Sequence, residues 1–182
     1  LAQMGLSRHK EICEAIKTAL DADTLLSAVL GTGEFKLQKK YWNRYSSFQE
    51  VKSKGFIAPL RRTNPVFENL KVKWMCPVLV GVMIPADGSV KMSSTDDDIL
   101  IQVAERLEDI FCSQGKNKIP AVIAAVGQSR TPDTEKFYFE LCTATTGDPY
   151  IEPAIQAGFE AVAVVVTITI QFNKKDFSTL GS

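Results

Sequence analysis

The stretch EAVAVVVTITIQF, residues 160–172, decides the fold that this sequence predicts. It is long and rich in β-branched residues, which is typical of a strand in the middle of a sheet or one that completes a ring of strands. A second run, KVKWMCPVLVGVMI at residues 71–84, alternates at first and then becomes continuously apolar. It predicts another strand, with one half buried on both faces. Because Pro77 has no N–H to donate, we expect part of this strand to be an edge or a bulge.

Between these two runs, the segment SSTDDDILIQVAERLEDIF at residues 93–111 has the periodicity of a helix. Its apolar residues recur on one face, at Ile99, Val103, Leu107 and Ile110. Ser94 or Thr95 is a suitable N-cap, and the acidic run 96–98 suits the positive end of the helix dipole. The sequence therefore predicts an amphipathic helix from about 96 to 113.

The N-terminal part predicts a second amphipathic helix over 7–20, with a break near Asp21 and a further helical turn over 24–30 that ends at Gly31. We expect two more strands, at 120–126 and 136–145. Residues 31–70 mix aromatic and charged residues with glycine and proline, and they predict an arm or loop with short strands near 35–42 and 55–62. Residues 173–182 form the expected C-terminal tail.

These elements define an α+β class. We expect a single domain over residues 1–182, because that length supports one core. It should contain a mixed, mostly antiparallel sheet packed against two amphipathic helices, with residues 31–70 as an extended arm.

Composition limits the function further. The chain has 21 basic and 21 acidic residues, and this zero net charge disfavours broad nucleic-acid binding. The four cysteines form no CxxC pair and lie in apolar stretches, as expected of buried, reduced thiols. No apolar run is long enough to span a membrane, and the first residues lack the pattern of a signal peptide. We expect a soluble, intracellular protein.

No motif predicts catalysis, a cofactor or a metal. The segment GTGEFKLQKK lacks the order of a phosphate-binding loop. His9 is the only histidine, and its place among charges at the start of a surface helix predicts an exposed side chain. Helix capping explains the acids at 96–98. A small enzyme remains as an alternative only if Asp133, Glu135 and Asp148 converge in the fold.

The arm offers a positive candidate, an interface for another protein, because aromatic residues and arginine carry much of the binding energy at such surfaces. The candidate interface residues are Phe35, Tyr41, Trp42, Arg44, Tyr45, Phe48, Arg61 and Arg62. Stacking of nucleic-acid bases on the same aromatics is the alternative, and overall neutrality favours a protein partner.

The order of these elements resembles the tail terminator and tail completion proteins of tailed bacteriophages. The resemblance runs from the first helix, RHKEICEAIKTAL, through KWMCPVLVGVMI and DDDILIQVAERLEDIF to the strands KFYFELCTAT and EAVAVVVTITIQF. It covers most of the chain and includes no diagnostic residue. The long segment 31–70 and Pro77 depart from the family pattern.

The resemblance implies a structural virion protein in the tail or neck, assembled in the host cytoplasm. Its expected partners are copies of itself in a homohexameric ring, the tail tube protein and the head connector or neck protein, with DNA only as passing cargo. Such a ring ends tube polymerisation and joins the tail to the head. The alternative is another tail or neck subunit, such as a tail tube or baseplate hub, which should show more strand and less helix.

Overall fold

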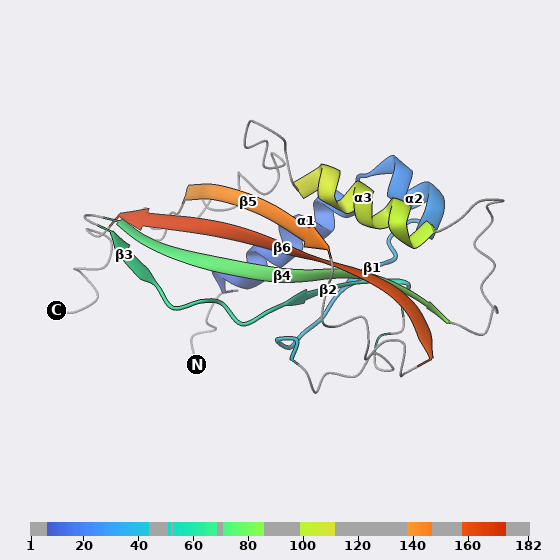
Figure 1. Ribbon diagram of the computed structural model, residues 1–182, viewed down its shortest axis with the longest axis horizontal. Helices are drawn as coiled ribbons and strands as arrows, with labels where there is room; N and C mark the ends of the chain where they lie inside the picture. The colour runs from blue at the N-terminus through green and yellow to red at the C-terminus, as the bar shows by residue number, and fades with distance from the viewer. Residues whose placement is uncertain are drawn as a thin grey trace, which may run out of the picture.

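The structure is a computed structural model that describes residues 7–43, 51, 53–68, 71–85, 99–111, 138–146 and 158–173. Its helices are α1 (Arg8–Asp21), α2 (Thr24–Leu30) and α3 (Ile99–Phe111). Its strands are β1 (Phe35–Leu37), β2 (Gly55–Pro59), β3 (Val66–Glu68), β4 (Lys71–Pro85), β5 (Tyr138–Thr146) and β6 (Phe159–Asn173). Figure 1 shows how these elements are arranged.

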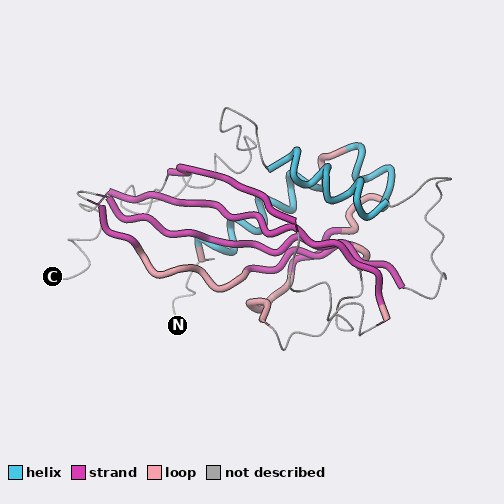
Figure 2. Tube along the Cα trace, in the orientation of Figure 1, coloured by secondary structure: helices cyan, strands magenta, loops and turns pink. Residues whose placement is uncertain are grey.

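All six strands belong to one sheet, in the order β1-β2-β4-β6-β5, and β3 also pairs with β4. Only β1 and β2 are parallel, and the other described pairings are antiparallel. In Figure 2 the long strands run beside one another along the long axis of the molecule. The expected α+β class, with a mixed and mostly antiparallel sheet, is confirmed.

The two apolar runs form the centre of the sheet. β4 and β6 pair along their whole length, from Lys71 opposite Asn173 to Pro85 opposite Phe159. Val78 and Leu79, on opposite faces of β4, are both fully buried, as expected of a strand that is covered on both faces. The prediction of two long, buried strands is therefore confirmed.

Pro77 lies in this central strand, opposite Thr167, and not in an edge strand. Its carbonyl accepts a hydrogen bond from the backbone N–H of Leu60, on the side of β4 away from β6. The imide nitrogen faces the same side, where residues 60–65 link β2 to β3. Since no ladder hydrogen bond is required from Pro77 there, the proline is tolerated without a bulge.

The three helices cover one face of the sheet. Residues of α1, α2 and α3 share one buried cluster with alternate residues of β4 and β6, including Val78, Val80 and Val166. A smaller cluster lies on the opposite face, where Trp42, Val51 and Phe56 pack on other residues of the same strands. At this second face Phe56 fills the space above Gly81, where an added Cβ would lie 2.3 Å from its ring.

The predicted helix break is confirmed. α1 ends at Asp21, and the side chain of Asp23 caps α2 by accepting a hydrogen bond from the backbone N–H of Leu26. α2 ends at Leu30, and its C-cap Gly31 has a φ of 102°, a conformation that favours glycine. The described residues therefore form three helices, since the turn predicted over 24–30 is the separate helix α2. No helix in the described ranges is long and apolar enough to cross a membrane.

Residues 31–70 agree with expectation in part, because the short strands expected near 35–42 and 55–62 are β1 and β2, whereas β3 was not expected. Their described parts contribute β1, β2 and β3 to the sheet, because β1 and β2 pair with each other and β2 and β3 pair with β4. Part of the expected arm is therefore built into the fold. The predicted caps Ser94 and Thr95, the acids at 96–98, the strand at 120–126 and the tail beyond Asn173 lie outside the described residues.

Candidate functional site

A cavity in the described structure lies between the start of α1 and β4, and we call it the α1–β4 cavity. Its volume is about 310 Å³. Five segments build it: the first turn of α1, the residues after β1, the linker between β2 and β3, strand β4 and strand β6. It is lined by Ser7, Arg8, His9, Tyr41, Arg62, Trp74, Cys76 and Ile170.

His9 is buried in this wall, with only 4% of its surface exposed. The expectation of an exposed histidine was wrong, because α1 starts against β4 and not in solvent. The Nε2 atom donates a hydrogen bond of 2.9 Å to the carbonyl of Pro77. The Nδ1 atom is buried and has no hydrogen-bond partner among the described residues.

Burial lowers the pKa of His9, the hydrogen bond to Pro77 opposes this shift, and the positive charges of Arg62 and Lys10 add to it. The imidazole is therefore neutral at pH 7, with its proton on Nε2. Tyr41 lies beside it, with 5.7 Å between the ring centroids.

Two arginines lie against Trp74. The guanidinium carbon of Arg62 is 4.1 Å from the centroid of the Trp74 ring, and that of Arg8 is 5.8 Å away. Both distances are within the range of cation–π contacts. None of the described residues that line the cavity is acidic, so the cavity has a positive electrostatic character.

The cysteine that lines the cavity is not an activated nucleophile. Burial raises the pKa of Cys76 to about 11, although Arg62 and Arg8 lower it. Burial likewise raises the pKa of Cys13 to about 12. Both thiols are protonated and buried, as the sequence predicted. The described residues contain no group of three or more His, Cys, Asp or Glu that could hold a metal ion. Binding an anion is the chemistry that this cavity favours.

A second hollow, which we call the α2–α3 groove, lies between these two helices and has a volume of about 370 Å³. Its apolar residues include Leu25, which is 59% exposed, and Val29, which is also exposed. Glu105 and Asp109 of α3 form an acidic rim. The groove thus combines exposed apolar surface with negative charge.

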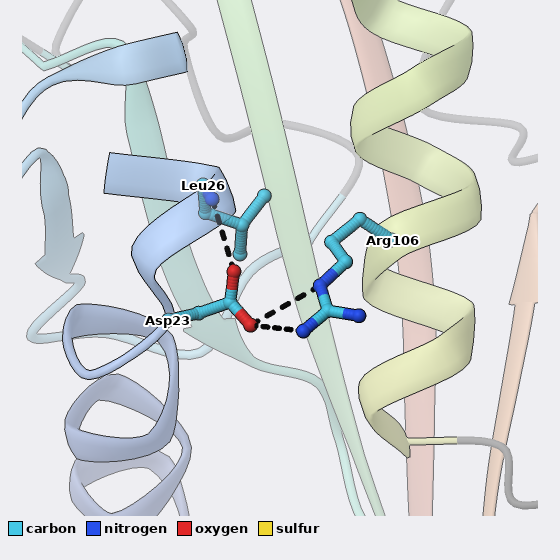
Figure 3. Close-up of polar contacts among 3 residues, drawn as sticks. All are labelled: Asp23, Leu26 and Arg106. Atoms are coloured by element: carbon cyan, nitrogen blue, oxygen red, sulfur yellow. Dashed lines mark hydrogen bonds and ion pairs between the residues drawn. The ribbon is translucent and has the colours of Figure 1, made fainter. Parts of the chain in front are cut away.

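An ion pair holds the two sides of this groove together (Figure 3). The Oδ2 atom of Asp23 accepts hydrogen bonds from Arg106, at 3.1 Å from Nε and 2.6 Å from Nη2. Burial alone raises the pKa of Asp23, but the hydrogen bonds from Arg106 and from the Leu26 N–H outweigh it and lower the pKa. The ion pair therefore links the start of α2 to the middle of α3.

A third surface surrounds the short strand β3, and we call it the β3 edge. Its exposed apolar residues are Val66, Phe67 and Met75, and Phe67 is 65% exposed. Arg61 precedes the strand, and Lys73 pairs with Val66. In the described part of the sheet β3 pairs only with β4, so its outer side has free ladder positions.

Some of the predicted interface residues are buried in the structure, and others are exposed. Phe35 is in the main core, and Trp42 is 6% exposed and stacks on Phe56 with 5.2 Å between the ring centroids. These two expectations are corrected. Phe35 lies in β1, which pairs with β2, and the backbone N–H of Trp42 donates a hydrogen bond to the carbonyl of Pro59 at the end of β2. Tyr41, Arg61 and Arg62 are exposed, as an interface requires. Arg44, Tyr45 and Phe48 lie outside the described residues.

Sequence reasoning missed His9, Trp74, Leu25 and Val29 as functional candidates. The charged neighbours of His9 concealed its burial, which depends on contact with Pro77, far along the chain. The exposed apolar pair on α2 did have a signal, since Leu25 and Val29 are spaced as neighbours on one helix face. Comparison with known proteins finds no family model and no curated protein that matches this chain.

Proposed function

We propose that this chain is a structural subunit that binds copies of itself, one surface of each subunit contacting a different surface of the next, and closes into a ring. The class is that of the tail terminator and tail completion proteins of tailed bacteriophages, which the order of elements in the sequence resembles. The observation that carries the proposal is the presence of two different exposed apolar surfaces, the α2–α3 groove and the β3 edge. In Figure 1 β3 lies at one end of the long axis, and α2 and α3 lie toward the other.

Two unlike surfaces favour a ring over a two-fold dimer. A two-fold dimer joins one surface to its own copy, whereas a ring joins one surface of each subunit to a different surface of the next. Here one surface is a hollow and the other includes an edge strand, so they differ in shape. Two unlike surfaces therefore support a subunit that would bind a neighbour on each side.

The charges on the two surfaces support this contact. Arg106 in the groove is paired with Asp23, which leaves the acidic Glu105 and Asp109 beside it, and Arg61 before β3 is basic. Complementary potentials guide association and fix the register of an interface. Contact between the groove of one subunit and the β3 edge of the next would also remove Leu25 and Phe67 from water.

In the virion, such a ring would lie at the head-proximal end of the tail, end polymerisation of the tube, and present a surface to the head connector. DNA would pass through its lumen. The equal numbers of basic and acidic residues suit this role, because a passage for DNA must not retain it.

The first test is the mass of the purified protein. Native mass spectrometry should show one closed species, at six times the 20.1 kDa chain mass if the ring is a hexamer. Electron micrographs should show rings with a central hole. A monomer at concentrations of tens of micromolar, on the order of what a weak interface needs, would refute the ring.

Two substitutions test contact between the α2–α3 groove of one subunit and the β3 edge of the next. Leu25→Glu damages the groove and leaves the β3 edge intact, whereas Phe67→Glu does the reverse. Each variant alone should be a monomer, and a mixture of the two should give a 1:1 dimer that grows no further. Ile101→Glu is the matched control, because Ile101 is 53% exposed on α3 and does not line the groove. A mixture that stays monomeric would contradict this pairing of surfaces.

A further inference from the structure

The α1–β4 cavity has features that ring assembly does not require. It is concave and positively charged, and its volume of about 310 Å³ lies at the lower end of the range for small-molecule sites. We propose that it binds a compact oxyanion, a carboxylate or phosphate group, between Arg62, Arg8 and the first turn of α1.

Arg62 is the main ligand-binding residue in this proposal. Its guanidinium carbon is 4.1 Å from the centroid of the Trp74 ring, a distance that fits stacking of the planar group on the indole. Stacking uses the face of the guanidinium and leaves the N–H groups on its edge for hydrogen bonds. Those N–H groups match the two oxygens of a carboxylate or phosphate. The indole thus orients Arg62 for an anion.

The start of α1 supplies further positive potential. Ser7 caps this 14-residue helix, and Ser7, Arg8 and His9 all line the cavity. The positive end of the helix dipole therefore faces the same space as the arginines. The cavity brings together three sources of positive potential, and no described residue in its lining supplies a carboxylate.

His9 contributes a buried polar side chain to the same wall of the cavity. Its ring is almost wholly buried, its Nε2 atom is committed to the Pro77 carbonyl, and its Nδ1 atom has no partner among the described residues. A buried polar atom without a hydrogen bond costs on the order of 1–3 kcal/mol, so such atoms usually have a function or a bound partner.

Isothermal titration calorimetry tests the proposal with three probes: inorganic phosphate, citrate and acetate. Each titration is done at constant ionic strength set with sodium chloride, so that general screening does not imitate binding. The wild-type protein should bind at least one probe saturably. Phosphate alone would identify a phosphate site, and citrate or acetate alone a carboxylate site. Binding of both kinds would identify a general oxyanion site.

Two neighbouring arginines make a matched pair of variants. Arg62→Ala should weaken binding about 10-fold or more, because it removes a charge-assisted pair of hydrogen bonds. Arg61→Ala removes the same charge one residue away, outside the cavity lining, and should change the affinity less than about 2-fold. Arg62→Lys should lie between them, since lysine keeps the charge and loses the planar fork.

Two results would overturn the proposal. One is the absence of saturable binding of all three probes to the wild-type protein, with folding verified by circular dichroism. The other is an equal loss of affinity in Arg61→Ala and Arg62→Ala, which would mean that the anion binds to general surface charge. Because Leu25→Glu and Phe67→Glu do not touch the cavity, binding to those monomeric variants separates this site from ring assembly.

Discussion

Replacement of Asp23 tests whether one side chain both caps α2 and ties it to α3. Its Oδ1 atom accepts from the N–H of Leu26 at 2.9 Å, and its Oδ2 atom accepts from Arg106. Asp23→Ala removes both interactions. Asp23→Asn keeps an oxygen for the cap and loses the charge that pairs with Arg106.

The expected sizes follow from these two roles. Loss of a helix N-cap costs about 1 kcal/mol. The side chain of Asp23 is mostly buried but that of Arg106 is 37% exposed, so solvent screens the pair and its contribution is at most about 1 kcal/mol. We therefore expect Asp23→Ala to lower the free energy of unfolding by about 2 kcal/mol, and Asp23→Asn by about 1 kcal/mol.

Urea unfolding at pH 7 measures both values, with Glu105→Gln as a control for loss of an acid from the same surface. The pH dependence gives a second readout. Because the pKa of Asp23 is below its usual 3.8 in the folded protein, the ion pair stabilises fully above that pH and is lost as pH falls through the folded pKa. The free energies of unfolding of the wild type and of Asp23→Asn should therefore become equal in strong acid. If Asp23→Asn and Asp23→Ala lowered the free energy of unfolding equally at pH 7, the separate contributions of the cap and the ion pair would be refuted.

Two further predictions concern the packing and the buried histidine. Gly81→Ala should destabilise the fold by about 2 kcal/mol in urea unfolding, because its Cβ would meet the buried ring of Phe56. Adding Phe56→Leu should restore part of the loss, and strict additivity would argue against this clash. Since the pKa of His9 is lowered below 6.5, its neutral form stabilises the fold fully above pH 6.5, and that stability declines as pH falls toward the folded pKa. His9→Gln keeps an amide donor for the Pro77 carbonyl, so the free energy of unfolding of this variant should no longer show this decline between pH 8 and 5. An unchanged decline would assign the pH dependence to another group.

The sequence predicted the elements whose signal is local. The apolar spacing of α3, the β-branched run of β6 and the helix break near Asp21 each lie within one segment, and each prediction agrees with the structure. Pro77 shows the limit of such reasoning. Whether a strand tolerates proline depends on what lies beside it, and here that is the linker before β3.

The candidate sites depended more strongly on distant contacts. Trp42 is of a residue type common at interfaces, yet it stacks on Phe56, and its backbone N–H donates to the Pro59 carbonyl at the end of β2. His9 has the setting of a surface residue, yet it is buried because α1 starts against β4. Exposure is a property of the folded sheet, so a sequence segment read alone cannot supply it.

The long pairing of β4 with β6 also determines when the protein can fold. Residues 86–158 separate the two strands, so the ribosome must complete β6 before the centre of the sheet can form. Until then, β4 is a long apolar strand with one side open to other nascent chains. Such distant strand pairing is slow compared with helix formation. Cells that make this protein should therefore need to shield β4 during translation, and its soluble yield should depend on temperature and chaperone supply.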